Sequence, residues 1–161
     1  MVEEQVSGKA LHYKHYNSLT QTVKQTYSML SCQQPDLKVL VVDDHELTRF
    51  SLQLALSSQK NIQLVGLASN GQEAIEMVKN HLPDVVILDL QMPVLDGLSA
   101  SNHIKSVVPH AQIIAYSSWE DPQTEVMSQT ARIDAFCRKD TSNEELIELI
   151  NNLGQRAIGG K

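Results

Sequence analysis

The chain has 161 residues, of which 42% are hydrophobic, and it carries a formal net charge of −6. This length and composition suit one domain of ordinary size with a short extension, and the acidic balance makes the chain a poor nucleic-acid surface on its own. Its two cysteines lack metal-like spacing and no apolar run approaches the roughly 18 residues of a membrane span, so we expect a cytoplasmic protein with reduced thiols.

Residues 1–36 are rich in Ser, Thr, Gln and Asn, and we expect them to form an extension of the domain. Ser18 and Gln21 have the spacing of a capping box, and apolar residues recur at helical spacing around them. These apolar positions are Leu19, Val23, Tyr27 and Leu30. The pattern predicts about three turns of amphipathic helix, which would pack on the domain or on a partner. A solvated tail is the alternative.

From residue 37 the chain alternates between short apolar runs and amphipathic stretches, which predicts five pairs of strand and helix. The predicted strands cover residues 39–42, 62–68, 85–88, 113–116 and 133–137. Strands that alternate with helices in this way form a parallel sheet with right-handed crossovers. We therefore predict an α/β fold with a doubly wound sheet that is covered by helices on both faces.

The predicted helices are located by their apolar stripes and caps. Leu47, Phe50 and Leu54 give the stripe of the first helix, which should begin near Asp44 or His45. The later helices are expected to begin after Asn70, after Gly97, near Glu120 and after Ser142, with the one at Glu120 ending near Thr130. Gly97 is also expected to let the chain turn before its helix.

Charged and hydroxyl side chains follow four of the predicted strands. Asp43 and Asp44 follow the first, Asp89 follows the third, Ser117 follows the fourth and Lys139 follows the fifth. Because the carboxyl ends of parallel strands meet at one edge of the sheet, these side chains should lie together. Three neighbouring carboxylates raise the pKa of at least one of them unless a cation is present, and a few oxygen ligands with room for water suit Mg²⁺.

Such a cluster has the parts needed for phosphoryl transfer to a carboxylate. That reaction is catalysed mainly by positioning and by neutralising charge, which a metal ion, a lysine and a hydroxyl donor would do here. Asp89 is the residue that would form the acyl phosphate, because it follows four consecutive apolar residues and points into the crevice at the sheet edge.

The ordered set of motifs resembles the receiver domain of two-component response regulators. The motifs are Asp43-Asp44, the stretch Asp89-Leu90-Gln91-Met92-Pro93-Val94-Leu95-Asp96-Gly97, Tyr116-Ser117-Ser118, and Lys139. The resemblance covers roughly residues 37–155 and implies a flavodoxin-like (CheY-like) five-stranded sheet of order 2-1-3-4-5. Residues 156–161 then look like the start of a linker or tail.

The resemblance implies a role for each residue of the cluster. Asp89 would be the phosphoacceptor, supplied by a sensor histidine kinase or a phosphotransfer protein. Asp43, Asp44 and Asp89 would hold Mg²⁺ together with the backbone carbonyl of Gln91, and Lys139 would form an ion pair with the phosphoryl group. We expect no enzyme in the usual sense, only self-directed phosphoryl transfer and autodephosphorylation.

The resemblance also implies a conformational switch. Ser117 would be the hydroxyl that moves toward the phosphoryl group, and Phe136 the aromatic side chain that swings with it. The surface formed by the fourth helix, the fifth strand and the fifth helix would then form a homodimer or release an output domain. Asp-Asp-His at residues 43–45 with Lys139-Asp140 resembles the NarL/FixJ branch, whose members usually carry a C-terminal helix-turn-helix domain. We therefore expect a longer transcriptional regulator that contacts DNA only through that domain.

Two alternatives belong to other functional classes. A Mg²⁺-dependent phosphohydrolase would need a second acid two residues after the nucleophile, where this chain has Gln91. A stand-alone or pseudo-receiver binding module that acts without phosphorylation would usually lack one of the acids or the lysine. Among single residues, Ser117 could be an ordinary strand-end serine, Lys139 a surface lysine and Phe136 a plain core residue. Lys139 is followed by Asp140 rather than proline, so we predict a trans peptide bond there.

Overall fold

The computed structural model describes residues 36–118 and 132–159. The helical extension expected within residues 1–36 and the helix expected over residues 120–130 therefore lie outside the described residues, except for Asp36. Lys139 and Asp140 are joined by a trans peptide bond, as predicted. None of the described helices is long and apolar enough to cross a membrane.

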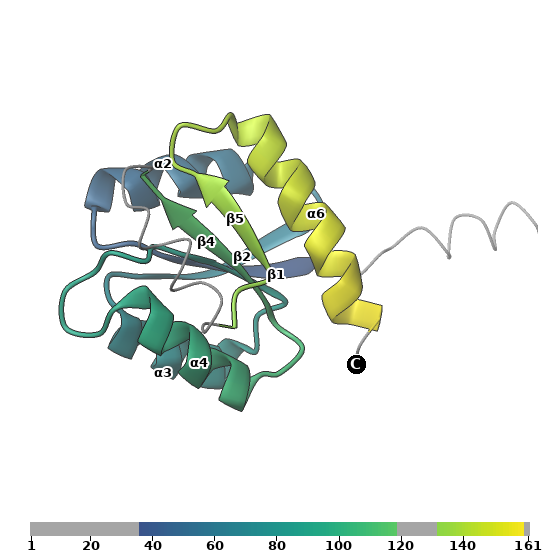
Figure 1. Cartoon of the computed structure of the whole chain (residues 1–161). Coiled ribbons are helices and arrows are strands. Elements are labelled where there is room, and N and C mark those ends of the chain that lie inside the picture. Colours follow the sequence, from purple (N-terminus) through teal and green to yellow (C-terminus); the bar gives the residue numbers. More distant parts are fainter. Residues whose placement is uncertain (1–35, 119–131, 160–161) are drawn as a thin grey trace, which may run out of the picture. The chain divides into compact units, whose positions relative to one another are not determined.

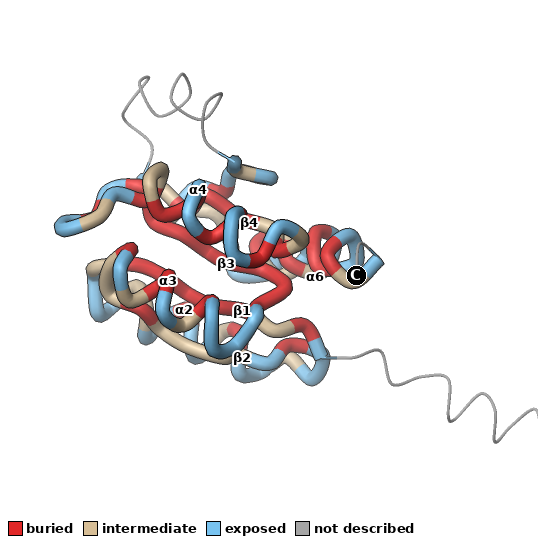
Figure 2. The backbone as a smooth tube through the Cα atoms, turned by 90° about the horizontal axis from the view of Figure 1, so that it is seen from below, coloured by how far each residue is buried: buried red, intermediate tan, exposed pale blue. Residues whose placement is uncertain are grey.

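The centre of the fold is a parallel sheet of five strands in the order β2-β1-β3-β4-β5, which confirms the predicted topology. The strands are β1 (Leu37–Val42), β2 (Ile62–Ala68), β3 (Val85–Leu88), β4 (Gln112–Ser117) and β5 (Ala135–Arg138). Every residue of β3 is buried, and so are residues 39–42 of β1. Their apolar runs therefore fill a sheet that is covered on both faces (Figure 2).

Two pairs of helices cover the two faces of the sheet (Figure 1). The helices are α2 (Glu46–Ser57) and α6 (Asn143–Gly159) on one face, and α3 (Gly71–His81) and α4 (Gly97–Val107) on the other. One buried cluster joins side chains of α2 and α6 to alternate residues of β1 and β3, and a second cluster joins α3 and α4 to the other alternate residues. This arrangement leaves the loops after the strands at one edge of the sheet.

The buried face of α2 differs from the predicted one. Leu47, Phe50 and Leu54 are 83%, 56% and 59% exposed, whereas Leu52 and Leu56 enter the core. The prediction was wrong because α2 carries two apolar stripes at helical spacing, and periodicity alone does not say which of them faces the sheet. We call the exposed set, Leu47, Phe50 and Leu54, the α2 stripe.

The last helix is longer than predicted. Its first turn is capped by the Ser142 hydroxyl, which accepts a hydrogen bond of 3.3 Å from the Glu145 amide. The helix then continues to Gly159, and Ala157 is fully buried. Residues 156–159 therefore continue α6 and do not begin a linker, because the packing of Ala157 holds the end of the helix against the domain.

The loop between β3 and α4 is tightly packed under the third strand. A Cβ atom at Gly97 would lie 2.2 Å from the backbone oxygen of Asp89, so only glycine fits there. The expected turning role of Gly97 is wrong, since its φ is not positive. The left-handed position of the loop is Val94, with a φ of 73°. A β-branched residue is strained in that conformation.

Replacing Val94 by asparagine should stabilise the domain. The Val94 side chain is 87% exposed, so its loss costs little packing, and asparagine adopts a φ of 73° more easily. We expect Val94→Asn to raise the free energy of unfolding by about 1 kcal/mol in urea denaturation. Val107→Asn, at the end of α4, is the control and should give no gain. Equal effects of the two substitutions would contradict the strain at Val94.

Candidate functional site

The register of β1 and β3 brings two acids together at the edge of the sheet. Val42 and Leu88 are partners in the ladder, and the Asp89 amide continues the pairing by donating a hydrogen bond of 2.8 Å to the Val42 carbonyl. Asp43 is held on its other side, where its amide donates to the Ala68 carbonyl at 3.1 Å. Both carboxylates are buried. The backbone thus fixes two acidic groups side by side where water has little access.

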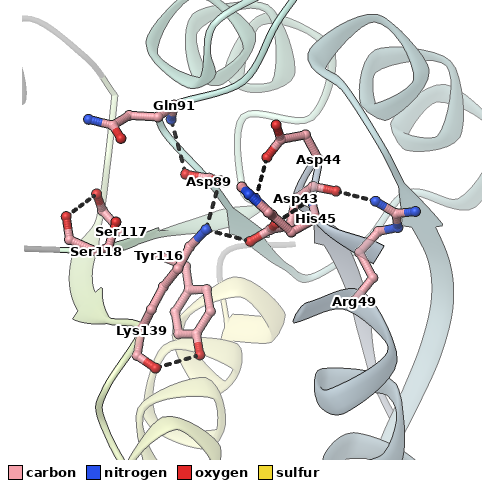
Figure 3. Close-up of polar contacts among 10 residues, drawn as sticks. All are labelled: Asp43, Asp44, His45, Arg49, Asp89, Gln91, Tyr116, Ser117, Ser118 and Lys139. Atoms are coloured by element: carbon pink, nitrogen blue, oxygen red, sulfur yellow. Dashed lines mark hydrogen bonds and ion pairs between the residues drawn. The ribbon is translucent and has the colours of Figure 1, made fainter. Parts of the chain in front are cut away.

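Lys139 bridges these two acids (Figure 3). Its Nζ lies 2.8 Å from Oδ2 of Asp43 and 2.8 Å from Oδ2 of Asp89. The backbone of Lys139 is anchored as well, because its amide donates to the Ser117 carbonyl at 3.0 Å. The aliphatic stem passes near Tyr116, whose ring centroid is 6.0 Å from Nζ. One partly buried cation therefore pairs with two buried anions.

Burial and the neighbouring charges shift the pKa values of Asp89 and Lys139. Burial raises the pKa of Asp89, and the hydrogen bonds from Lys139 and from the Gln91 amide oppose that rise only in part. Burial acts to lower the pKa of Lys139, but its contacts with Asp43 and Asp89 outweigh burial and raise it. Lys139 is thus protonated at neutral pH and pairs as a cation with the acids.

His45 is a member of the site that the sequence analysis did not select. Its Nδ1 lies 2.9 Å from Oδ1 of Asp44 and 3.5 Å from Oδ1 of Asp43, while its amide donates to Oδ1 of Asp43 at 2.8 Å. Arg49, one turn into α2, donates from Nη1 to the Asp43 backbone oxygen at 2.7 Å. The signal for His45 was its position directly after the acid pair.

The acidic cluster has the donor atoms for a divalent cation. Asp43, Asp44, His45 and Asp89 each offer one ligand atom, and these atoms all lie within 4.8 Å of one another. Oδ2 of Asp43 and Oδ1 of Asp44 are buried and accept no well-directed hydrogen bond, although Lys139 and His45 are close to them. Buried oxygens in this state are suited to a metal ion.

The remaining predicted residues lie around this cluster. Gln91 is exposed, and its amide donates to Oδ1 of Asp89 at 3.0 Å. The Ser117 hydroxyl donates to the Ser118 carbonyl at 3.4 Å and is turned away from Asp89 (Figure 3). Phe136 is 51% exposed on β5, so the interpretation of it as a core residue is wrong. The structure thus gathers the acids and the lysine, and leaves Ser117 and Phe136 outside the cluster.

Comparison with known proteins gives one family. The chain matches the profile of the response regulator receiver domain over residues 39–151. It is 33% identical over 112 residues to the uncharacterized transcriptional regulatory protein YhcZ of Bacillus subtilis, an alignment that covers 70% of this chain and 52% of YhcZ. It is 32% identical over 114 residues to the response regulator protein VraR of Staphylococcus aureus, covering 71% of this chain and 54% of VraR.

Solved structures agree with the sequence comparison. The signal receiver domain of the response regulator NarL from Mycobacterium tuberculosis is similar with a TM-score of 0.71 and 29% identity, covering 76% of this chain and 98% of that one. The response regulator domain of CheB from Thermotoga maritima is similar with a TM-score of 0.67 and 29% identity, covering 74% of this chain and 97% of that one. The chain spans about half the length of the curated relatives it matches.

Removing Lys139 should destabilise the domain in a way that a divalent cation repairs. Lys139→Met leaves two buried carboxylates facing each other, and we expect it to lower the free energy of unfolding by about 2 kcal/mol in EDTA. Excess MgCl₂ should restore most of this loss by binding the same acids. The measurement is urea denaturation with and without Mg²⁺.

Lys105→Met is the matched control for this experiment. Lys105 is a buried lysine that also pairs with an acid, and its Nζ lies 2.6 Å from Oδ2 of Asp134, away from the cluster. Its loss should destabilise the domain to the same degree in either buffer. The quantity compared is the gap in the free energy of unfolding between each variant and the wild type in the same buffer. If Mg²⁺ narrows this gap equally for both variants, the special response expected of Lys139→Met is contradicted.

Proposed function

The chain belongs to the response regulator receiver domain family, and from this premise we propose that it is a phosphoacceptor that is phosphorylated on Asp89 in a Mg²⁺-dependent reaction. The observation that carries the proposal is the position of Asp89, which is buried at the sheet edge, 2.8 Å from the Lys139 ammonium and beside Asp43 and Asp44. Burial would keep water away from an acyl phosphate, while the charged neighbours would offset the charge of the incoming group.

The chemistry follows from the groups present. An Asp89 oxygen attacks the phosphorus of a phosphohistidine, the new O–P bond forms as the donor's P–N bond breaks, and the released imidazole nitrogen takes up a proton. Asp43, Asp44, Asp89 and the Gln91 carbonyl would hold Mg²⁺, which when bound neutralises phosphoryl charge. Lys139 keeps Asp89 ionised before transfer and offers its ammonium to the phosphoryl oxygens afterwards.

The same residues argue against the alternative functions. A hydrolase needs a base to activate water, and the side chain two residues after Asp89 is the exposed amide of Gln91. Transfer and loss of the phosphoryl group would therefore be self-directed and slow. A binding module that acts without phosphorylation needs no lysine between two buried acids, yet Lys139 is held there at the cost of part of its hydration.

We extend the proposal to the response that follows. A phosphoryl group adds about −1.5 to −2 charges at Asp89, which would draw in Lys139 and the Ser117 hydroxyl. Phe136 would move with Ser117, and the surface that includes β5 and α6 would change its affinity for a second copy or for an output domain. The name of YhcZ supports a transcriptional role, which would act on DNA through a domain outside this chain.

The α2 stripe is placed to receive the phosphoryl donor. A histidine kinase or phosphotransfer protein must bring its phosphohistidine to Asp89, so its surface has to cover the rim of the site. The stripe begins at Leu47, two residues after His45, and exposes three large apolar side chains along one helix. We propose that the donor protein docks on this stripe, because an apolar row of this kind fits the groove of a helical partner.

Incubation with acetyl phosphate and Mg²⁺ tests the phosphoacceptor. Intact mass should rise by one phosphoryl group in the wild type and in Asp36→Asn, an exposed acid before β1, and should not rise in Asp89→Asn. EDTA should abolish the change, because the acids would lack their ion. Catalytic release of phosphate would favour the hydrolase, and no modification under any condition would favour the binding module.

The docking proposal separates donor recognition from chemistry. With a phosphotransfer protein that phosphorylates the wild type, Phe50→Asp should slow transfer at least about tenfold, equivalent to about 1.4 kcal/mol of lost contact. Its rate with acetyl phosphate should stay unchanged. Leu82→Asp, on a half-exposed leucine after α3, is the control and should affect neither rate. If Phe50→Asp slows transfer equally from the phosphotransfer protein and from acetyl phosphate, the substitution damages the site itself, and docking on α2 is contradicted.

A further inference from the structure

His45 lies beside the acidic site, but the proposed phosphoryl transfer gives it no role. It is the residue before α2, and its side chain is 71% exposed. Although it occupies the N-cap position, its side chain makes no capping hydrogen bond to the helix. The ring is instead directed to the acids, with Nδ1 near one carboxylate oxygen of Asp44 and one of Asp43 (Figure 3). Capping of α2 therefore does not explain this orientation.

The separations of these atoms match those of ligands around one ion. Neighbouring ligands of an octahedral ion with bonds of about 2.1 Å lie about 3.0 Å apart, and opposite ligands about 4.2 Å apart. Nδ1 of His45 lies 2.9 Å from Oδ1 of Asp44 and 3.5 Å from Oδ1 of Asp43, close to the separation of neighbouring ligands. The whole set with Asp89 spans up to 4.8 Å, so these atoms would draw slightly closer together around a bound ion. The imidazole nitrogen thus takes the place of one more ligand beside the carboxylates.

A second observation indicates that the site is built for a cation. Asp43 is almost completely buried, and its Oδ2 accepts no well-directed hydrogen bond. Burying a carboxylate oxygen without such a partner is costly, and an ion in the cluster would remove that cost. The Lys139 ammonium lies 2.8 Å from this oxygen, so a bound ion would share the oxygen with the lysine.

We propose that His45 is a metal ligand through Nδ1, and that it gives the site a preference for late first-row divalent ions over Mg²⁺. This rests on the proposed function, because it assigns a ligand to the same divalent site. Magnesium takes oxygen ligands and gains little from imidazole, whereas Co²⁺, Ni²⁺ and Zn²⁺ bind imidazole well. An all-oxygen site would discriminate less between these ions. His45 would thus make occupation of the site depend on which divalent ion is available.

Calorimetric titration of untagged protein with CoCl₂ and with MgCl₂ tests the proposal. His45→Ala should weaken Co²⁺ binding at least about tenfold and change Mg²⁺ affinity by less than about twofold. His81→Ala, an exposed histidine at the far end of α3, is the control and should change neither affinity. Because His45 is exposed and caps nothing, its replacement should leave the fold intact.

Proton NMR of the Co²⁺ form gives a second readout. A histidine bound through Nδ1 keeps its Nε2 proton, so the wild type and His81→Ala should show a strongly shifted exchangeable signal that His45→Ala lacks. If Mg²⁺ and Co²⁺ affinities fall together, or if the signal is missing from the wild type, His45 is only a hydrogen-bond partner of Asp44. If the wild type binds no Mg²⁺, the proposed function itself fails.

Discussion

The ammonium of Lys139 between two buried carboxylates is the interaction on which the site depends. Parallel pairing of β1 with β3 forces Asp43 and Asp89 together, and burial makes each of their charges expensive. Lys139 offsets that expense from a loop whose backbone is bonded to Ser117 at the end of β4. Lys139 thus links the charge at Asp89 to the ends of β4 and β5, the route by which the proposed phosphorylation would reach those strands.

The sheet and the meeting of the acids were predictable because both follow from burial. Four apolar residues in β3 followed by Asp89 predict a strand that is covered on both faces, with the acid at the rim of the sheet. The same reasoning applies to β1 and Asp43. Once both strands are parallel in one sheet, their ends coincide, and Lys139 reaches the two acids from the end of β5, across β4.

Other features depend on contacts that a pattern does not contain. The α2 helix has apolar residues on two sides, so only packing on the sheet decides that Leu52 is buried and Leu47 is not. Gly97 is explained by the Asp89 backbone that lies against it, not by its own conformation. The end of α6 has the composition of a linker, yet Ala157 finds a place in the core. Each of these was decided by a neighbour distant in sequence.

Under the proposed function, recognition of the donor and chemistry at Asp89 would depend on the same segment of chain, from the acids at the end of β1 to α2. The three large apolar side chains exposed on α2 add little to the stability of this domain, which is the reason for proposing that a partner covers them. The helix that carries them begins directly after His45, and its Arg49 donates a hydrogen bond of 2.7 Å to the Asp43 carbonyl. A protein that docks on α2 and shifts it would therefore move the Asp43 backbone. Binding of the donor would in this way affect the arrangement of the charged groups around Asp89, which would receive the phosphoryl group.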